Sequence, residues 1–413
     1  MPNNTPKYWQ VSLFLIFFVW ISFFPFPLVD RYGWYIKIAF GAILLFINFF
    51  NKVQNPLIEA RDWSLWLFLF VILLNIINAV NKSLALSAYL NIALASLVAF
   101  YIGKFVFASL QNRVFLCLVI SVCAFIVATF GLFEFIFGKN ILYVKFIPNS
   151  YYERYSVYFP RPMSTQFNPV ILGSFLIGCL PFSFIFCESK IKLHRIFGTI
   201  AVIVSVSTIL LTASRGVFLG FAALCGFYLW KSGKGKLIFA YILLLLTFAL
   251  FCSSSANKNL RQIGFDKILY GTFDSSISSY RVDRASMAMR MASEHPISGV
   301  GLKHFRFLFN KYSKYGDGSI EPYELMIPDN MYLSLLSETG FLGLLAFLTF
   351  IFLLVKGGIQ RFNAEQDRQV KLTILMPLCA LIGLLVNMGA YDLFYWDNPL
   401  MLFSLICGFI TAI

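Results

Sequence analysis

The chain has 413 residues, of which 59% are hydrophobic and 13% are charged, and its formal net charge is +14. A soluble domain usually has about 25% charged residues, so this composition excludes an ordinary soluble protein. The cations do not form a basic stripe with interleaved aromatic residues, which excludes a nucleic-acid-binding protein.

Apolar runs long enough to cross a bilayer recur along nearly the whole chain. A hydrocarbon core roughly 30 Å thick requires about 20 apolar residues per helix. The runs predict an all-α polytopic membrane protein with about twelve transmembrane helices. We expect the spans at residues 11–29, 34–50, 63–80, 84–107, 114–137, 168–187, 195–213, 216–230, 236–253, 331–355, 371–390 and 398–413.

The predicted spans divide the chain into three parts. Residues 1–253 hold helices 1–9 with an outer loop at about 138–167. Residues 254–330 form a large extracytoplasmic loop that contains short helices, and residues 331–413 hold helices 10–12. Lys and Arg gather in alternate short connections, which places the N-terminus in the cytoplasm and both long loops outside. The eight Cys lie in or beside apolar runs without the spacing of metal ligands, so we expect no metal site.

One helix is predicted inside the large loop, from Tyr280 to Ser293. Apolar residues recur there every three or four positions, and Arg281 and Arg284 share a neighbouring face. His295-Pro296 should end this helix, because proline disfavours a helical residue before it. The following Gly299-Val300-Gly301 predicts a flexible turn close to the membrane.

Four basic sites face outward in this topology. They are Arg161, Arg215, the pair Arg281 and Arg284, and the group Lys303, His304 and Arg306. Any of these cations could simply reach the lipid headgroups. Arg215 is different, because it occupies a very short turn between two apolar helices and needs an anion there. Guanidinium groups match phosphate oxygens bidentately, so several of them would suit a diphosphate.

A carboxylate marks the point where the large loop re-enters the membrane. Asp329 and Asn330 precede the tenth predicted span. Asp329 is interpreted either as the N-cap of that helix or as a carboxylate that accepts a proton from an attacking hydroxyl. Glu134 and Glu338, at the ends of spans, are weaker candidates. Tyr391, Asp392, Trp396 and Asp397 mark the last outer loop.

The order of these motifs resembles the O-antigen ligase and Wzy-type polysaccharide polymerase family. The matching blocks are Arg161-Pro162 with Asn168-Pro169, then Thr212-Ala213-Ser214-Arg215-Gly216, then Arg281 with His295-Pro296 and Gly299-Val300-Gly301, and finally Asp329-Asn330 with Gly340 and Gly343. With the span count, the resemblance covers most of the chain.

The resemblance implies a GT-C-like, metal-independent glycosyltransferase without a cofactor, in a bacterial inner membrane with its active site facing the periplasm or the exterior. Its donor would be a glycan on undecaprenyl diphosphate, and its acceptor a glycan or lipid-linked acceptor. Arg215 and Arg281 would hold the diphosphate, and Asp329 would act at the acceptor hydroxyl. Arg161 would be a third ligand of the diphosphate. From their outward positions alone, Arg284, Lys303, His304 and Asn330 are further candidates for substrate binding.

Three functions stay open. A polymerase would join lipid-linked repeat units, and a ligase would transfer the same donor to lipid A core or another acceptor. The family's ligases carry His where this chain has Asp329, which favours the polymerase. A flippase or transporter of lipid-linked sugars is the third reading, although transporters more often show repeats and broken helices at mid-membrane.

Overall fold

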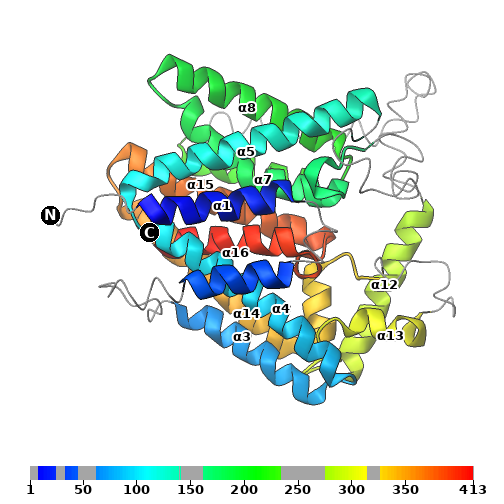
Figure 1. The fold of residues 1–413 in the computed structure, drawn as a ribbon. Helices are drawn as coiled ribbons and strands as arrows, with labels where there is room; N and C mark the ends of the chain where they lie inside the picture. The colour runs from blue at the N-terminus through cyan, green and yellow to red at the C-terminus, as the bar shows by residue number, and fades with distance from the viewer. Residues whose placement is uncertain are drawn as a thin grey trace, which may run out of the picture. The chain divides into compact units, whose positions relative to one another are not determined.

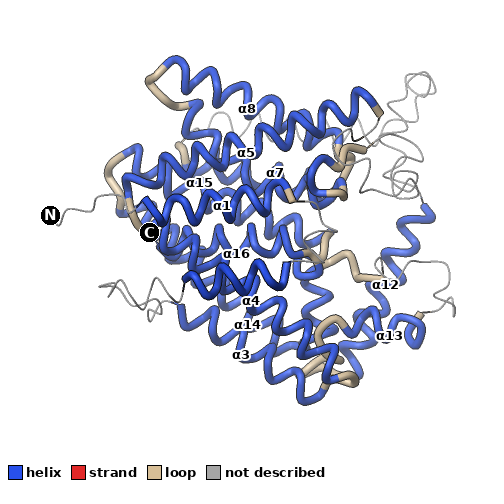
Figure 2. Tube along the Cα trace, in the orientation of Figure 1, coloured by secondary structure: helices blue, strands red, loops and turns tan. Residues whose placement is uncertain are grey.

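The computed structural model describes residues 8–24, 33–44, 62–138, 140, 161–233, 275–313 and 326–412. Every regular element in these residues is a helix, which confirms the predicted all-α class (Figures 1 and 2). Contacts divide the chain into two compact units, each assembled from three stretches of sequence. Unit 1 comprises Met1–Val29, Ser109–Ser275 and Glu365–Asn387, and unit 2 comprises Asp30–Ala108, Ser276–Ala364 and Met388–Ile413.

Six helices in the described residues are long and apolar enough to cross a bilayer. They are Lys82–Phe107, Asn112–Phe137, Pro169–Cys187, Lys192–Leu211, Met331–Ala364 and Arg368–Ala390. Four shorter apolar helices are Val11–Phe23, Gly33–Leu44, Trp63–Asn78 and Asp397–Ala412. The chain is therefore a multi-pass membrane protein, whereas the number of spans and the loop layout remain predictions. The ninth predicted span, 236–253, and most of the loop at 138–167 lie outside the described residues.

Unit 1 is built around one buried helix. Its helices are α1 (Tyr8–Phe23), α5 (Leu110–Phe137), α7 (Pro169–Cys187), α8 (Lys192–Leu211), α9 (Arg215–Lys231) and α15 (Arg368–Asn387). Helix α7 contacts α5, α8, α9 and α15, and most of its residues are buried. Its start is fixed by sequence, because the Asn168 side chain accepts from the N–H of Val170 at 2.8 Å and proline occupies the first helical position.

Unit 2 packs two of its helices very closely. It contains Gly33–Leu44, α3 (Trp63–Leu74), α4 (Lys82–Phe107), α14 (Met331–Ala364) and α16 (Asp397–Ala412). A Cβ at Gly103 of α4 would collide with the carbonyl of Leu405, and one at Gly408 of α16 with the carbonyl of Phe100. Small residues of this kind let helix backbones approach inside a membrane, where lipid is as apolar as the side chains.

A buried ion pair adds polar contacts to unit 2. The Lys37 ammonium lies 2.6 Å from the Asp397 carboxylate, and its side chain is 1% exposed. Asn91 accepts from the same ammonium and donates to the other Asp397 oxygen at 2.9 Å. Because both charges and the amide are satisfied by one another, the group can lie among apolar helices. The sequence predicted Asp397 in the last outer loop. In the structure it is the first residue of α16.

Two further helices of unit 2 belong to the large loop of the sequence. Helix α12 (Ser275–Glu294) ends directly before His295-Pro296, as predicted, and α13 (His304–Tyr312) follows. They share a small apolar core with the residues before α14. This core consists of Met287, Ala288, Met291, Val300, Phe305, Phe309, Tyr312 and Met326. The core holds α12 in a defined orientation, and with it the face that carries Arg281 and Arg284.

Candidate active site

The predicted site residues are distributed over both units. Arg161 and Arg215 belong to unit 1, and all the others belong to unit 2. Within unit 1 the two predicted arginine blocks meet, because the Arg161 Nε donates to the carbonyl of Thr212 at 2.7 Å. Arg215 is the first residue of α9, three residues after that carbonyl. Two motifs about fifty residues apart in sequence thus form one local structure.

Glu134 shapes the backbone beside Arg161. Its buried carboxylate accepts from the N–H of Met163 at 2.9 Å and from the N–H of Ser164 at 2.6 Å. Ser164 has a positive φ of 50°, which is uncommon for a residue other than glycine. Asn140 donates to the carbonyl of the same serine at 2.8 Å. The structure therefore uses this carboxylate to hold an irregular segment, a role that the sequence did not reveal.

In unit 2, α12 presents both of its predicted arginines to Asp329. The Arg284 Nη1 lies 2.6 Å from Asp329 Oδ2, and the Arg281 Nε lies 3.8 Å from the same oxygen. The Arg284 side chain is 11% exposed, whereas that of Arg281 is 44% exposed. The predicted common face of the two arginines is confirmed. On this face, Arg284 lies inside and contacts the Asp329 carboxylate closely, whereas Arg281 lies outside and reaches solvent.

Asn330 caps the helix that follows. Its side-chain oxygen accepts from the N–H of Tyr332 at 3.0 Å and of Leu333 at 3.1 Å, and its amide donates to the carbonyl of Gly389 at 3.0 Å. The cap that the sequence offered to Asp329 is thus supplied one residue later. Asp329 has a positive φ of 55°, and its carboxylate meets α12. The structure gives Asn330 a capping role, and its substrate contact remains a prediction.

Helix α14 is broken at Gly340, and the Gly299–Gly301 turn fills the break. Gly340 has φ 68° and ψ −171°, which are not helical values. The N–H groups of Val300 and Gly301 donate to the carbonyls of Ser337 and Glu338 at 3.0 and 2.9 Å. After the break, Phe341 and Leu342 donate to the carbonyls of Pro296 and Ile297. The turn that we expected to be flexible is therefore held against α14 by two of its own backbone hydrogen bonds, and the segment just before it is held by two more.

This arrangement explains why glycines recur in both motifs. A Cβ at Gly299 would collide with the backbone of Glu338, and a Cβ at Gly340 with the carbonyl of Ile297. Both glycines also have positive φ, which side chains disfavour. The His-Pro-x-x-Gly-Val-Gly segment and the residues up to Gly340 are thus two halves of one structure. It places Asp329 and the end of α12 at a fixed separation.

Asn75 is a residue that the sequence reading missed. It lies in η2 (Asn75–Asn78), and its amide donates to the carbonyl of Glu338 at 2.8 Å and to that of Ser298. Its side-chain oxygen accepts from the N–H of Leu302 at 3.1 Å. An amide inside the third apolar run was the only available signal, because polar groups in spans usually have a specific partner.

His304 and Lys303 have different environments. The His304 Nε2 accepts from the N–H of Asn81 at 2.9 Å, so its Nδ1 is the donor toward the carbonyl of Leu302 at 2.9 Å. Burial lowers the pKa of this neutral ring. Both nitrogens are occupied by backbone, so the geometry assigns His304 to the fold rather than to the predicted substrate contact. The Lys303 ammonium lies 5.7 Å from the centre of the Tyr395 ring, and burial lowers the lysine's pKa.

Two residues of the loop between α15 and α16, Asp392 and Tyr395, form hydrogen bonds with side chains of α14. The Tyr395 hydroxyl donates to the Glu338 carboxylate, and the Arg306 guanidinium lies 4.7 Å from the centre of the Tyr395 ring. Asp392 is fully buried and accepts from the Ser334 hydroxyl. Burial, followed by the nearby charge of Asp329, raises the pKa of Asp392 to about 8. The sequence had marked this loop without assigning it a role.

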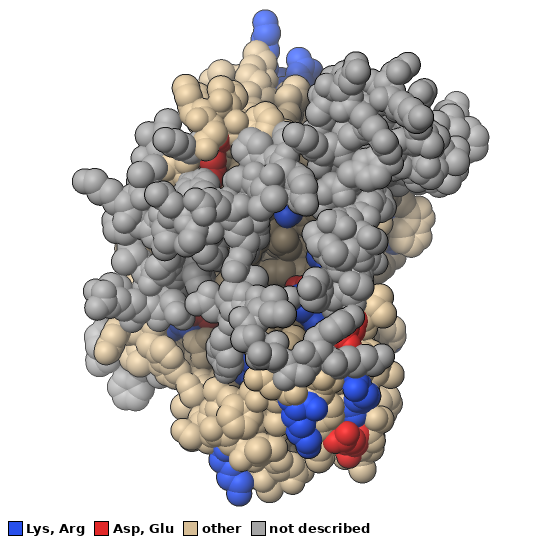
Figure 3. All heavy atoms as spheres, turned by 90° about the vertical axis from the view of Figure 1, so that its right-hand side faces the viewer, with Lys and Arg blue, Asp and Glu red and all other residues tan. Residues whose placement is uncertain are grey.

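Figure 3 faces the side of the molecule where α12 and α13 lie, and Lys and Arg side chains lie beside Asp and Glu side chains there.

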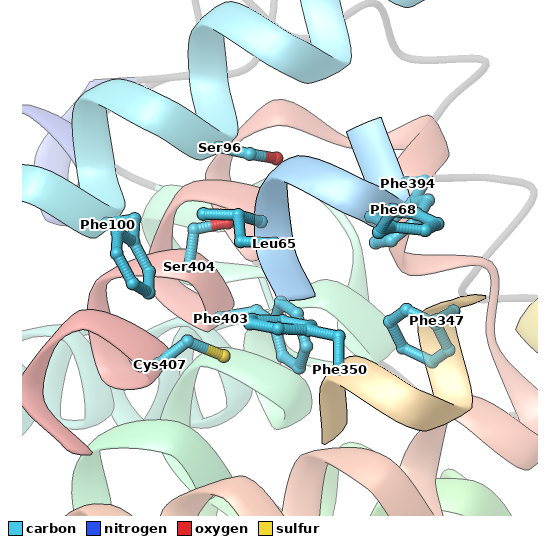
Figure 4. A pocket seen from close by; sticks show the side chains of 10 residues that line it. All are labelled: Leu65, Phe68, Ser96, Phe100, Phe347, Phe350, Phe394, Phe403, Ser404 and Cys407. Carbon is cyan, nitrogen blue, oxygen red and sulfur yellow. The ribbon is translucent and has the colours of Figure 1, made fainter. Parts of the chain in front are cut away.

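A separate pocket in unit 2 is apolar, and Figure 4 shows aromatic rings around it. None of the predicted site residues lines it. Its lining is Leu65, Phe68, Ser96, Phe100, Phe347, Phe350, Phe394, Phe403, Ser404 and Cys407. The described charges that could act on a substrate therefore lie elsewhere.

Comparison with known proteins gives one match to a family model, over part of the chain. Residues 200–348 match the family model described as O-antigen ligase, and this segment includes Arg215, α12, the Gly299–Gly301 turn and Asp329. No curated protein matches the chain. The matched segment holds the residues that pack the fixed turn into α14 and set two arginines against a carboxylate. Over residues 200–348 the chain is therefore similar to the O-antigen ligase family of membrane proteins.

Proposed function

We propose that the protein is a glycosyltransferase that polymerises undecaprenyl-diphosphate-linked oligosaccharide repeat units on the outer face of the bacterial inner membrane. The donor and the acceptor would both be lipid-linked glycans, and the reaction would need no metal or cofactor. The observation that carries this proposal is the contact of Arg284 and Arg281 with Asp329. In this contact, the guanidinium groups could bind a diphosphate and the Asp329 carboxylate could accept a proton.

The arginines suit a diphosphate because their charge is permanent and their N–H groups match phosphate oxygens. Asp329 holds Arg284 at 2.6 Å in the free protein. An incoming diphosphate would compete for that guanidinium, since it carries more negative charge than one carboxylate. Asp329 would then lose its closest cation and become a better base. Binding of the donor would thereby prepare the carboxylate for the acceptor.

The reaction that follows is a direct displacement. The acceptor hydroxyl oxygen forms a bond to the anomeric carbon of the donor, and its proton passes to Asp329. The bond between the anomeric carbon and the diphosphate oxygen breaks, and its electron pair stays on the diphosphate. The arginines stabilise that developing charge without a proton transfer. One displacement of this kind inverts the configuration of the anomeric carbon.

Arg215 and Arg161 keep the role that the family resemblance implies, as further ligands of the diphosphate or the donor glycan. Their support comes from unit 1 alone, where the hydrogen bond from Arg161 to the carbonyl of Thr212 joins the two arginine blocks just before α9 begins at Arg215. Both lie in segments that were expected to face outward. Their contribution is tested by substitution, independently of the cluster in unit 2.

Ligase activity is the second candidate, and the description of the matching family as O-antigen ligase favours it. A ligase would use the same donor and the same cation chemistry, with lipid A core or another acceptor. Residue 329 separates the two candidates, because the resemblance implies His at this position in ligases and this chain has Asp. That difference favours the polymerase.

Glycan analysis of a strain without the gene tests the proposal, with complementation by wild type, Asp329→Ala or the control Asp367→Ala. Asp367 lies in the exposed connection to α15, so its loss should leave transfer intact. A polymerase predicts single repeat units on the acceptor lipid in the deletion and Asp329→Ala strains. Long chains that accumulate on undecaprenyl diphosphate would identify a ligase instead.

A further inference from the structure

Asp392 is a buried carboxyl group with an incomplete set of partners. It lies between η7 (Met388–Ala390) and η8 (Leu393–Tyr395), outside the spans, and none of its surface reaches solvent. One of its oxygens accepts from the Ser334 hydroxyl, in the first turn of α14. The other oxygen is buried and forms no hydrogen bond of good geometry within the described residues, and the backbone N–H of Asp329 is close enough only to oppose part of the effect of burial. The group is therefore poorly suited to carry a full negative charge.

The charges around Asp392 are negative. Asp329, at the start of α14, and Glu338, one turn beyond Ser334, both disfavour its ionisation, and no ion pair joins it to a described cation. Tyr391 and Tyr395, in its own segment, are the other titratable neighbours. Asp329 differs, because Arg284 and Arg281 stabilise its ionised form. Two carboxyl groups of one site thus have opposite environments.

We propose that Asp392 is a positioning residue that keeps a proton beneath Asp329, so that Asp329 is the single ionised carboxylate facing the arginines of α12. This inference rests on the proposed function, and it assigns no proton transfer to Asp392 itself. A second negative charge below Asp329 would attract Arg284 inward and repel a diphosphate. The neutral carboxyl leaves the positive charge of α12 available to the donor.

A pH dependence follows from the sign of the shift. Burial and the charge of Asp329 raise the pKa of Asp392 to about 8, with the Ser334 hydroxyl and the backbone N–H of Asp329 acting in the opposite direction. The group is neutral below that value and ionises above it. Transfer should therefore fall as the pH rises through about 8, approaching a tenfold loss per pH unit if the ionised form is inactive.

The test is transfer of a lipid-linked saccharide by the full-length protein in proteoliposomes, measured from about pH 6 to about pH 10. Asp392→Asn mimics the neutral carboxyl, so the variant should keep wild-type transfer at neutral pH within about twofold and lack the alkaline fall. A loss of more than about tenfold at neutral pH would show that the ionised form is needed, and the proposal fails. An alkaline fall identical to that of the wild type would overturn it too.

Thermal unfolding gives a second measurement that does not depend on catalysis. The folded pKa is above the unfolded value of 3.8, so the folded state binds an extra proton between these values and its stability falls as pH rises toward about 8. Asn cannot ionise. The Tm of Asp392→Asn relative to the wild type should therefore rise over this interval and then level off, and a constant difference would contradict a retained proton.

Asp329→Asn and Arg284→Ala, measured in the same assay, separate the two proposals. If both variants retain full transfer, the proposed function fails, and the unfolding measurement alone decides whether Asp392 holds a proton. If both lose transfer while Asp392→Asn keeps the wild-type alkaline fall, only the inference about Asp392 is wrong.

Discussion

Glu134 in unit 1 and Asp329 in unit 2 are two carboxylates in similar sequence settings with different partners. Glu134 lies near the end of α5 and Asp329 lies just before α14, and the fold brings each of them beside a predicted arginine block. Glu134 accepts two backbone N–H groups and shapes the segment that carries Arg161. Asp329 accepts from the guanidinium of Arg284. A carboxylate in an apolar chain can therefore accept hydrogen bonds from backbone N–H groups or pair with a cationic side chain. Only its partners in the fold distinguish these two roles.

Replacing each carboxylate with its amide tests this difference, and we expect the greatest change in transfer from these substitutions. Asp329→Asn removes the base and the ion pair, so transfer in proteoliposomes should fall by about 10²- to 10⁴-fold. Glu134→Gln keeps an acceptor oxygen for the same two N–H groups, so transfer should fall by less than about tenfold. Equal losses in the two variants would show that both carboxylates have a charge-dependent role.

Substitutions of one arginine in each unit should reduce transfer by the next largest factor, and they extend the comparison between unit 1 and unit 2. Arg215→Ala in unit 1 and Arg281→Ala in unit 2 should each reduce transfer by about 10²-fold or more at unchanged expression, because each removes charge that stabilises the leaving group. Arg290→Ala is the matched control, since this arginine of α12 forms no ion pair with a carboxylate in the described residues. Near-normal transfer in both test variants would remove the diphosphate role.

The smallest effect concerns Asn330, which lies beside Asp329 and caps α14. Asn330→Ala should lower the unfolding free energy by about 0.5–2 kcal/mol, because two N–H groups lose their acceptor. Asn330→Asp keeps an accepting oxygen and should restore most of that stability. Thermal unfolding of the two variants checks the cap. A large loss of transfer in Asn330→Asp at normal stability would instead reveal the predicted substrate contact.

The sequence predicted the helices well because they depend on local patterns. Apolar runs predicted the all-α membrane class, and His295-Pro296 predicted the end of α12 at Glu294. The common face of Arg281 and Arg284 followed from their spacing of three residues. These features could be predicted because the hydrogen bonds that form a helix join residues close in sequence.

The partners of the polar groups could not be predicted in the same way. The sequence offered Asp329 as a cap and the Gly299–Gly301 turn as flexible, whereas Asn330 supplies the cap and the break of α14 fixes the turn. Asn75 and His304 hold backbone groups more than two hundred residues away. Contacts at that separation leave no periodic pattern in the chain.

By itself, the sequence determined that this protein is an all-α membrane protein, where α12 ends, and which motifs resemble those of a known family. Composition and local spacing are sufficient for those conclusions, because hydrophobicity and helix geometry act over a few residues. The tertiary structure alone decided which carboxylate meets an arginine, which one holds backbone, and which one is buried without a cation among the described residues. Those outcomes depend on the partner and the burial that distant segments provide, and partner and burial set the charge of a carboxyl group.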